Sequence, residues 1–394
     1  MSDLHELVLF DRSRVTTDWN CPRKRYWTYE YKGRGIVSSN THLELFLGTT
    51  IHDGLAAFAN QVPLEDVIKA AHEQVIEALL KDTSGEVDQV NFAMEQACLI
   101  EGMLRGFHKV VWPNLMKQYP VIKAIEQEMV YEYNGLTFMA KPDLVVQDNE
   151  GNNFYIEYKS TSSKKENWIN SWDTAIQLHS TVKAIEQTLG EPVVGVQIVG
   201  LYKGYEVYGK QTSPFCYAYK RLGTPPFSQD QTSYDYKAGF KKYPVWEMPG
   251  GVAKWIEGMP ENILGDQFPM PPPIFVNEDM VNSFFKQRAW REKEIHMTNQ
   301  MMEGMSEENR EGLMDVAYPQ RYENCKPYFG KPCQYLRLCF SEVPNPLEAG
   351  FQWRIPHHQP ELEQHVEDPV GSGLYQIRNS HHKLEREQDA PLEV

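Results

Sequence analysis

Long hydrophobic runs are missing from this sequence. A membrane-spanning helix needs about eighteen or more consecutive apolar residues, and no such stretch occurs in the chain. The N-terminus also lacks the charged-then-apolar pattern of a secretory signal. Hydrophobic residues still make up 41% of the 394 residues, which is enough for a substantial core. We therefore expect a soluble, cytoplasmic protein that works without a membrane.

Positive charge is scarce as well. Lys and Arg number 39 against 54 Asp and Glu, so the formal net charge is −15 at pH 7. A protein with this charge does not collect nucleic acid by bulk attraction. Any contact with nucleic acid would have to be a local basic groove. The chain also has no phosphate-binding loop of the G-x-x-x-x-G-K-S/T type, which excludes an ATP-driven motor of that class.

Cysteine is the third scarce feature. Four of the six cysteines are one N-terminal residue and a C-terminal C-x7-C-x5-C trio, namely Cys21, Cys325, Cys333 and Cys339. Without a secretory signal a disulfide framework is not expected, which favours a metal site over disulfides. Zinc ribbons use closer C-x2–4-C pairs, and free thiols are the remaining interpretation. Cys98 is expected to be a small buried residue, and Cys216 an ordinary member of a further strand at 215–219.

A candidate catalytic hairpin spans residues 140–159. Two apolar, β-branched runs flank a turn-forming D-N-E-G-N-N cluster there. Asp143 precedes the first strand, and Glu157 and Lys159 alternate along the second, so both point to one face. A carboxylate pair can bind a divalent cation through oxygen, and a neighbouring lysine can orient water near a phosphate. Taken alone, these residues also fit a solvated strand face.

Helices and strands alternate around this hairpin. An amphipathic helix is expected over residues 42–61, and a single strand over 121–133. A helix at about 171–189 and a strand at 193–202 are expected after the hairpin, and a long helix at about 277–302. The order of helix, three strands, helix and strand predicts an α/β fold.

Basic and aromatic residues are interleaved near the N-terminus. Arg23, Lys24 and Arg25 open the run R-K-R-Y-W-T-Y-E-Y. Such interleaving suits a groove that follows phosphates and stacks bases, and an aromatic structural segment with solvated cations is the alternative. Lys164 and Lys165 follow the hairpin in a polar loop and are further candidates for phosphate contacts.

At the hairpin, the chain resembles the PD-(D/E)XK nuclease superfamily. Pro142-Asp143 match the PD of its motif, and Glu157-Tyr158-Lys159 match the E-x-K. This resemblance implies an α/β fold whose restriction-endonuclease-like core is a central mixed sheet flanked by helices. It also implies hydrolysis of phosphodiester bonds with Mg²⁺ or Mn²⁺.

Two further motifs resemble the RecB-like branch of that superfamily. Gly48-x-x-x-His52 matches its upstream G-x-x-x-H motif, in which the histidine adds a nitrogen ligand to the metal site. Gln177 matches the first residue of its Q-x-x-x-Y motif, although Thr181 stands in place of the tyrosine. On residue type alone, His52 could equally be a packed core histidine.

The resemblance implies a role for each site residue. The implied metal ligands are the side chains of His52, Asp143 and Glu157 and the backbone carbonyl of Tyr158. Lys159 would orient the attacking water, and Gln177 would position Lys159 or the DNA strand. The superfamily often adds a carboxylate from the strand before the PD motif. Glu126 and Glu128 are both candidates by alternation, and we favour Glu126.

The four cysteines resemble the iron–sulfur staple of RecB-like exonucleases, among them AddB-like nucleases and CRISPR-associated single-strand exonucleases. In those families one N-terminal and three C-terminal cysteines hold a 4Fe-4S cluster that joins the two ends of the nuclease domain. The resemblance implies this role for Cys21, Cys325, Cys333 and Cys339, although the C-x7-C gap is wider than the family's usual spacing.

The sequence predicts six segments along the chain. In order, they are a cluster and DNA-groove segment, a helical segment carrying His52, the nuclease core, an insertion with a long helix, a second cluster segment and a disordered acidic tail. Their expected bounds are 1–40, 41–120, 121–222, 223–320, 321–340 and 341–394.

These features together predict a metal-dependent DNA exonuclease that favours single-stranded ends, with 5′-to-3′ polarity typical of the family. Its context would be recombination, repair or CRISPR-type DNA processing, in the host cytoplasm if a phage encodes it. Any helicase or recombination protein would be a separate partner. Two alternatives stay open, which are a non-catalytic DNA-end-binding or assembly subunit with the same fold and an RNA-processing nuclease.

Overall fold

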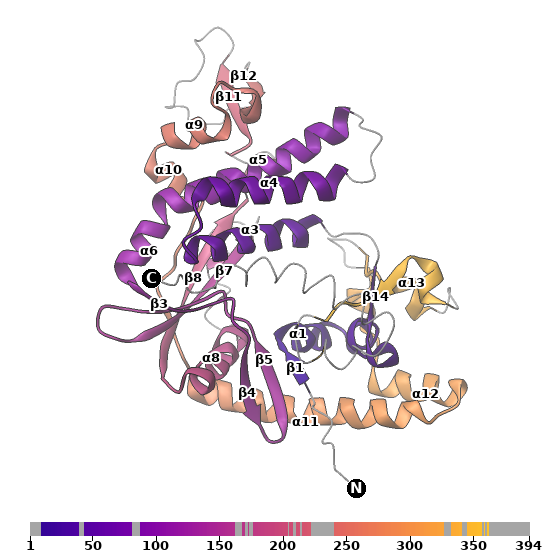
Figure 1. Cartoon of the computed structure of the whole chain (residues 1–394). Coiled ribbons are helices and arrows are strands. Elements are labelled where there is room, and N and C mark those ends of the chain that lie inside the picture. Colours follow the sequence, from indigo (N-terminus) through magenta and orange to yellow (C-terminus); the bar gives the residue numbers. More distant parts are fainter. Residues whose placement is uncertain are drawn as a thin grey trace, which may run out of the picture. The chain divides into compact units, whose positions relative to one another are not determined.

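The computed structural model of the chain contains two compact units (Figure 1). The first consists of Met1–Thr41, Val130–Ala140 and Ser283–Val394, and the second of His42–Met129 and Lys141–Asn282. The residues that the structure describes are 9–38, 43–80, 87–161, 168–169, 172, 176–203, 205–207, 210–212, 215–221, 240–326, 332–340, 345–356, 358 and 361. The predicted catalytic hairpin lies in the second unit.

The second unit is built on a five-stranded mixed sheet. Its strands, in spatial order, are β13 (Ile274–Phe275), β8 (Val193–Tyr202), β7 (Asn153–Thr161), β6 (Leu144–Gln147) and β3 (Val121–Ile125). Strands β7 and β8 run parallel, and every other neighbouring pair is antiparallel. Two smaller antiparallel pairs are formed by β9 (Tyr205–Val207) with β10 (Lys210–Thr212) and β11 (Tyr217–Arg221) with β12 (Phe240–Pro244). The mixed sheet agrees with the predicted fold class.

The hairpin of β6 and β7 is confirmed. Leu144 pairs with Ile156 and Gln147 with Asn153, so the two strands enclose the predicted turn. The Asp148 side chain closes that turn by accepting the backbone N–H groups of Glu150 and Asn152. The local turn chemistry therefore fixes the register that carries the candidate site residues.

Helices pack on this sheet and on one another, and they supply much of the core of the second unit. They are α3 (Leu43–Ala59), α4 (Leu64–Leu80), α5 (Val87–Val110), α6 (Trp112–Gln118), α8 (Ile176–Leu189), α9 (Gly251–Gly258) and α10 (Glu261–Gly265). Figure 1 shows α3, α4 and α5 lying together. Ile51 and Phe107 pack in one buried cluster with Val146 and Ile156 of the sheet. Gly54 allows the close approach of α3 and α5, because a Cβ there would meet a Leu104 methyl at 2.7 Å.

The single strand expected over 121–133 is interrupted. Strand β3 ends at Ile125, and β4 (Met129–Tyr133) begins after a three-residue gap and joins a different sheet. The chain turns at Glu126, whose φ of 46° lies in the left-handed region. The alternation that placed Glu126 and Glu128 on one strand face is therefore wrong.

The first unit contains a three-stranded sheet and the long helix α11 (Glu278–Glu303). Strand β5 (Leu136–Ala140) lies between β4 and β1 (Leu9–Asp11), and β1 runs parallel to it. Phe285 of α11 makes aromatic contacts with Phe10, Phe138, Tyr131 and Tyr133 on this sheet. The other helices are α1 (Arg12–Asn20), α2 (Pro22–Arg25), α12 (Glu307–Ala317) and α13 (Leu336–Cys339), with a π-helical turn at Tyr26–Glu30 and 3-10 turns at Tyr31–Gly33, Tyr322–Asn324 and Pro346–Ala349.

Part of the expected disordered tail is folded. Strand β14 (Phe351–Trp353) pairs antiparallel with β2 (Ile36–Ser38), and Trp353 stacks on Tyr31. Buried Glu361 contacts the guanidinium groups of Arg14 and Arg354. The prediction of a disordered tail is therefore wrong for residues 345–356, because aromatic packing and strand pairing hold them. Residues 362–394 lie outside the described part of the chain.

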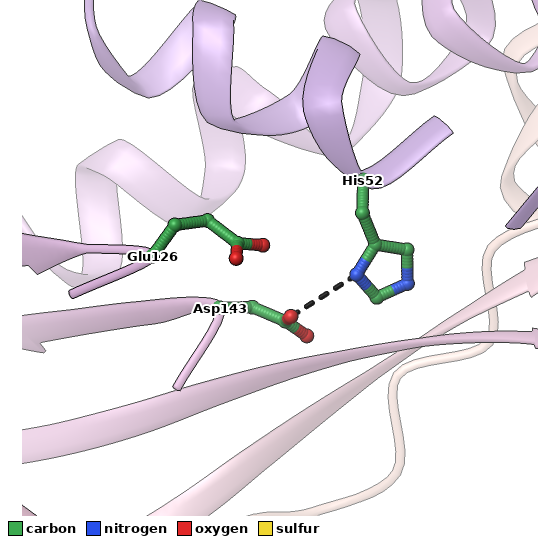
Figure 2. Close-up of side chains that lie close together, drawn as sticks. All are labelled: His52, Glu126 and Asp143. Atoms are coloured by element: carbon green, nitrogen blue, oxygen red, sulfur yellow. Dashed lines mark hydrogen bonds and ion pairs between the residues drawn. The ribbon is translucent and has the colours of Figure 1, made fainter. Parts of the chain in front are cut away.

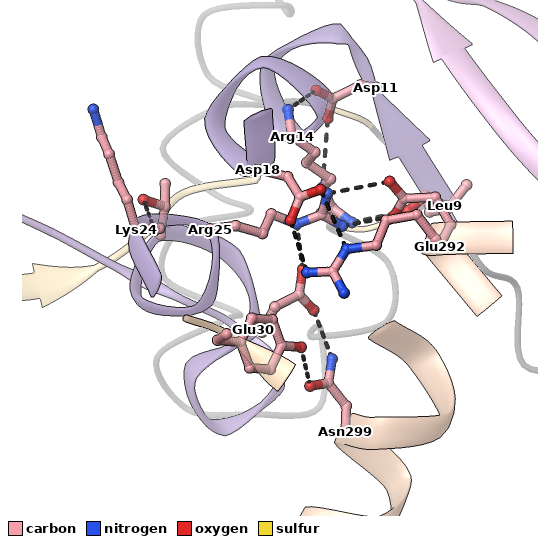
Figure 3. Close-up of polar contacts among 12 residues, drawn as sticks. Leu9, Asp11, Arg14, Asp18, Lys24, Arg25, Glu30, Glu292 and Asn299 are labelled. Atoms are coloured by element: carbon pink, nitrogen blue, oxygen red, sulfur yellow. Dashed lines mark hydrogen bonds and ion pairs between the residues drawn. The ribbon is translucent and has the colours of Figure 1, made fainter. Parts of the chain in front are cut away.

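A buried ion-pair network joins α11 to the N-terminal helices of the first unit (Figure 3). Arg25 donates to Glu292 Oε2 at 2.8 Å, and Arg288 contacts the same carboxylate. Arg288 and Arg291 also donate to the two Asp18 carboxylate oxygens, each at 3.0 Å. Burial alone would raise the pKa of Glu292, but the two guanidinium groups outweigh it and lower that pKa below 4.5.

We expect Glu292→Gln to lower the free energy of unfolding by about 3 kcal/mol at neutral pH, because two buried guanidinium groups lose their counter-charge. Since the folded pKa is lowered, this difference from wild type is full above pH 4.5 and shrinks as the pH falls below that value. Urea unfolding of both proteins at pH 7 and at about pH 3 measures it. The matched control is Glu294→Gln, because Glu294 pairs with Arg291 at the surface. This variant should lose less than about 1 kcal/mol of the free energy of unfolding. Equal losses for the two variants would contradict the network's role.

Candidate active site

Three side chains of the second unit converge at one end of the hairpin (Figure 2). His52 comes from α3, Asp143 from the residue before β6, and Glu126 from the turn after β3. One potential ligand atom from each lies within 4.8 Å of the other two. Among the described residues, no other group of three His, Cys, Asp or Glu side chains is this compact.

Asp143 is the centre of this group. Its Oδ2 accepts the backbone N–H of Tyr158 at 2.6 Å, and its Oδ1 lies 3.0 Å from His52 Nδ1. The backbone N–H of Glu126 donates to the Asp143 carbonyl at 3.1 Å. The hairpin partner strand, the helix and the turn thus each hold Asp143 by one hydrogen bond.

The electrostatics of the three groups differ. Burial alone would raise the pKa of Asp143, but His52 and Lys159 outweigh it and lower that pKa, so the carboxylate is ionised. Burial and the neighbouring Asp143 charge raise the pKa of Glu126, although Lys141 opposes the rise. For His52, burial would lower the pKa, but the Asp143 carboxylate outweighs burial and raises it. Two carboxylates that repel each other beside an imidazole favour the binding of a cation.

The donor set fits a divalent cation. Mg²⁺ and Mn²⁺ favour oxygen ligands with some imidazole, and Mg²⁺ binds oxygen at about 2.0–2.1 Å. Two ligand atoms on opposite sides of such an ion are therefore about 4.2 Å apart. Ligand atoms at right angles to each other on such an ion are about 3 Å apart, which matches the 3.0 Å between Asp143 Oδ1 and His52 Nδ1. All three ligand atoms lie within 4.8 Å of one another, so the group would draw together around the ion.

Glu157 and Lys159 lie on β7 beside this group. Glu157 is buried, and its carboxylate contacts the Lys159 ammonium group. Lys159 lies near enough for its charge to lower the pKa of Asp143. Of the expected metal ligands, His52 and Asp143 are brought together, whereas Glu126 rather than Glu157 completes the compact group.

The comparison with known families decides the class of this site. The PD-(D/E)XK nuclease superfamily matches residues 12–247, more than half of the chain. The chain belongs to the PD-(D/E)XK nuclease superfamily. No protein in the curated set matches it. Its superfamily is one of metal-dependent nucleases, and the group of His52, Glu126 and Asp143 has the side chains that could hold such a metal.

Tyr158 lies on β7 and Gln177 on α8 of the second unit. The backbone N–H of Tyr158 is used by Asp143, and its ring lies edge-on to those of His52 and Phe107. The buried Tyr158 hydroxyl has no hydrogen-bond partner among the described residues, and burial raises its pKa. Gln177 lies on α8, but its side chain lies outside what the structure describes, as do Lys164 and Lys165.

The N-terminal basic residues do not form the expected nucleic-acid groove. Arg23 and Arg25 are only 3% and 1% exposed. The Arg23 guanidinium group donates to the Tyr318 carbonyl and contacts Asp315, while Arg25 pairs with Glu292 as described above. Their role as nucleic-acid contacts is therefore wrong, because their charges are buried and already neutralised. Lys24 keeps no such buried partner and stays a candidate.

The four cysteines of the predicted cluster all belong to the first unit. Cys21 separates α1 from α2, the Cys333 N–H donates to the Cys325 carbonyl at 2.9 Å, and Cys339 ends α13. Among the described residues none of the four forms a disulfide, and burial raises the pKa of Cys339 to about 11. No three of the described thiols lie within 4.8 Å of one another.

Cys98 and Cys216 lie in the second unit, where Cys98 is buried as expected and Cys216 is buried too. The Cys98 thiol donates to the Phe215 carbonyl at 3.2 Å, and the Cys216 thiol to the Glu95 carbonyl at 3.4 Å. These contacts join α5 to the segment before β11. Neither thiol belongs to the predicted cluster.

Sequence reasoning missed one charged neighbour of the site. Lys141 lies two positions before Asp143 in the K-P-D stretch, and its Nζ is 2.8 Å from Glu126 Oε2. Its place in the motif predicts proximity to Asp143 but not its pairing with Glu126.

In the described part of the chain, no helix is long and apolar enough to cross a bilayer.

Proposed function

We propose that this protein is a Mg²⁺- or Mn²⁺-dependent DNA exonuclease of the RecB-like branch. The observation that carries the proposal is the compact group of His52, Glu126 and Asp143 with Lys159 beside it. Membership of the superfamily supports hydrolysis of phosphodiester bonds. The finer assignment to DNA ends rests on the resemblance of Gly48-x-x-x-His52 and Gln177 to the RecB-like motifs.

The side chains of His52, Asp143 and Glu126 would hold the cation, and Glu157 is the proposed further carboxylate. When bound, the cation lowers the pKa of water and neutralises negative charge that builds on the phosphate. Asp143 is ionised, and two hydrogen bonds orient its carboxylate toward the group. His52 must release the proton that its interaction with Asp143 favours.

Lys159 would act on the water rather than on the cation. Its ammonium group, held beside Glu157, can donate a hydrogen bond to a water that approaches the phosphate. The same positive charge offsets the negative charge that develops during attack. Gln177 would position Lys159 or the DNA strand. Single-stranded ends and 5′-to-3′ polarity are the family's typical preferences.

We also propose that Cys21, Cys325, Cys333 and Cys339 hold a 4Fe-4S cluster. Four free thiols share one unit, and the charges of Cys21 and Cys333 contribute to the raised pKa of Cys339. Zinc held by the same four thiols is the alternative. When bound, the 4Fe-4S cluster would join the N- and C-terminal segments of the first unit.

The proposed biological setting depends on DNA being the substrate. A DNA exonuclease without its own motor would act with a separate helicase or recombination protein in recombination, repair or CRISPR-type processing. If a phage encodes the chain, the setting is the bacterial host cytoplasm. A non-catalytic DNA-end-binding subunit is the alternative function, and it would keep the fold without needing Lys159 beside the metal group.

The deciding experiment uses single-stranded and duplex DNA labelled separately at each end. We expect anaerobically purified protein to shorten the single strands from one end in Mn²⁺, because the His52–Asp143–Glu126 group then carries its cation. EDTA should abolish cleavage and excess Mn²⁺ should restore it. RNA of the same sequence tests the RNA-processing alternative. Retardation of DNA without cleavage in Mn²⁺ would favour the DNA-end-binding subunit instead.

A further inference from the structure

Lys141 is the one charged side chain that contacts Glu126 in the described part of the site. Its Nζ lies 2.8 Å from Glu126 Oε2, and its side chain is 39% exposed while that of Glu126 is 25% exposed. Lys141 has no other polar contact among the described residues. The ion pair therefore lies at the solvent side of the metal group, where a substrate would approach.

The backbone holds this pair in place from both ends. Pro142 separates Lys141 from Asp143 and restricts the backbone between them. Glu126 adopts a φ of 46°, which is uncommon for a residue other than glycine, and its N–H is tied to the Asp143 carbonyl. Such backbone strain persists where the surrounding structure requires it, and it concentrates at functional sites. The strained turn serves to bring the Glu126 carboxylate between Asp143 and Lys141.

The charges of the site decide which partner Glu126 keeps. Without a divalent ion, Lys141 and His52 both offset the repulsion between the Glu126 and Asp143 carboxylates, and Lys141 is the one that contacts Glu126 directly. A divalent ion bound by both carboxylates neutralises them fully and repels the ammonium group. Lys141 then becomes an unneutralised charge, at the exposed rim of the site, on a long flexible side chain.

We propose that Lys141 exchanges partners, pairing with Glu126 before the cation binds and with a phosphate of the DNA strand afterwards. This proposal rests on the proposed nuclease function and adds a substrate-binding residue to it. The exchange makes phosphate binding depend on metal loading, because Lys141 is free for the strand only when a cation replaces it at Glu126. Binding of metal and of DNA would thus be coupled through one side chain.

The test begins with Mn²⁺ binding to the metal-free protein, measured by titration calorimetry without DNA. Lys141→Gln removes the competing charge and should tighten Mn²⁺ binding at least about fivefold, since a unit charge a few ångströms away contributes that much or more. Lys141→Arg keeps the charge and should bind Mn²⁺ as wild type does. Lys123→Gln is the matched control, because Lys123 pairs with Glu191 at the surface of the same sheet, and it should not change Mn²⁺ affinity.

The second measurement is the salt dependence of DNA binding in Mn²⁺, made in a Lys159→Ala background that should not cut. Adding Lys141→Gln to this background removes one phosphate contact. The slope of log affinity against log salt concentration should then fall by about one, and binding of all DNA sequences should weaken alike. Unchanged or weaker Mn²⁺ binding by Lys141→Gln would overturn the competition with the cation. Tighter Mn²⁺ binding with an unchanged salt slope would overturn the phosphate contact.

These outcomes are separable from failure of the proposed function. If wild-type protein neither binds Mn²⁺ nor cuts DNA, the nuclease function fails and the role of Lys141 fails with it. If wild-type protein binds Mn²⁺ and cuts DNA, while Lys141→Gln matches it in Mn²⁺ affinity and salt slope, only the role of Lys141 is overturned.

Discussion

Lys159→Ala should slow DNA cleavage by roughly 10²–10⁴-fold, the range found when a residue that moves protons or stabilises charge is removed. The ammonium group contacts Glu157 and acts on Asp143 through its charge, but it is not a metal ligand. Mn²⁺ affinity should therefore stay equal to or slightly tighter than that of wild type. Single-turnover cleavage of end-labelled DNA in saturating Mn²⁺ measures the first effect, and calorimetry measures the second.

The matched control for this variant is Lys123→Ala. Both lysines lie on strands of the same five-stranded sheet, but Lys123 belongs to its edge strand and pairs with Glu191 at the surface. We expect Lys123→Ala to cut DNA at the wild-type rate. Cleavage by Lys159→Ala within about threefold of wild type, with normal Mn²⁺ binding, would show that water is oriented by another group.

The hairpin could be predicted because its signals are local. The D-N-E-G-N-N cluster encodes a turn, and Asp148 closes that turn with its own side chain. Once the turn is set, alternation along β7 places Glu157 and Lys159 on one face without help from the rest of the chain. The hairpin supplies two of the five strands of the mixed sheet, whereas the superfamily match extends over residues 12–247.

The break in the chain at Glu126 could not be predicted from the local sequence. Neither glycine nor proline marks the break between Ile125 and Met129, so alternation continued the strand through it. The break depends on distant partners, because the Glu126 N–H pairs with Asp143 and β4 joins β5 and β1 in another sheet. Alternation left Glu126 and Glu128 both open as the extra carboxylate, with Glu126 favoured, and the uninterrupted strand behind that alternation was wrong.

The N-terminal arginines could not be assigned for a similar reason. Apart from Glu30, which also pairs with Arg25, their charged and carbonyl partners lie 267–295 positions away in the chain, on α11 and at the end of α12. An arginine paired with a buried carboxylate and an arginine facing DNA have the same local sequence pattern. Only the tertiary packing distinguishes them. The folded segment around β14 escaped prediction likewise, because its strand partner β2 lies at the other end of the chain.

Cys333→Ala should remove the iron and much of the stability of the first unit together. If the four cysteines hold a 4Fe-4S cluster, anaerobically purified wild type should contain about four iron atoms per chain and absorb broadly in the visible range. Because Cys21 and Cys325 are 304 positions apart, loss of the cluster opens a very long loop and frees both segments. Iron analysis and thermal unfolding of the same preparations measure the two effects.

Cys98→Ala is the matched control, since Cys98 is a buried free thiol of the second unit. It should keep its iron and lose only the packing of one small side chain. Stoichiometric zinc without iron in the wild type would contradict the cluster proposal. The same four cysteines would then bind a single zinc ion, and their sulfur atoms would have to move closer together. Iron retained in Cys333→Ala at the wild-type level would exclude Cys333 as a ligand. Because the nuclease group around Asp143 lies in the other unit, residual metal-dependent cleavage by Cys333→Ala would show that the two metal sites act independently.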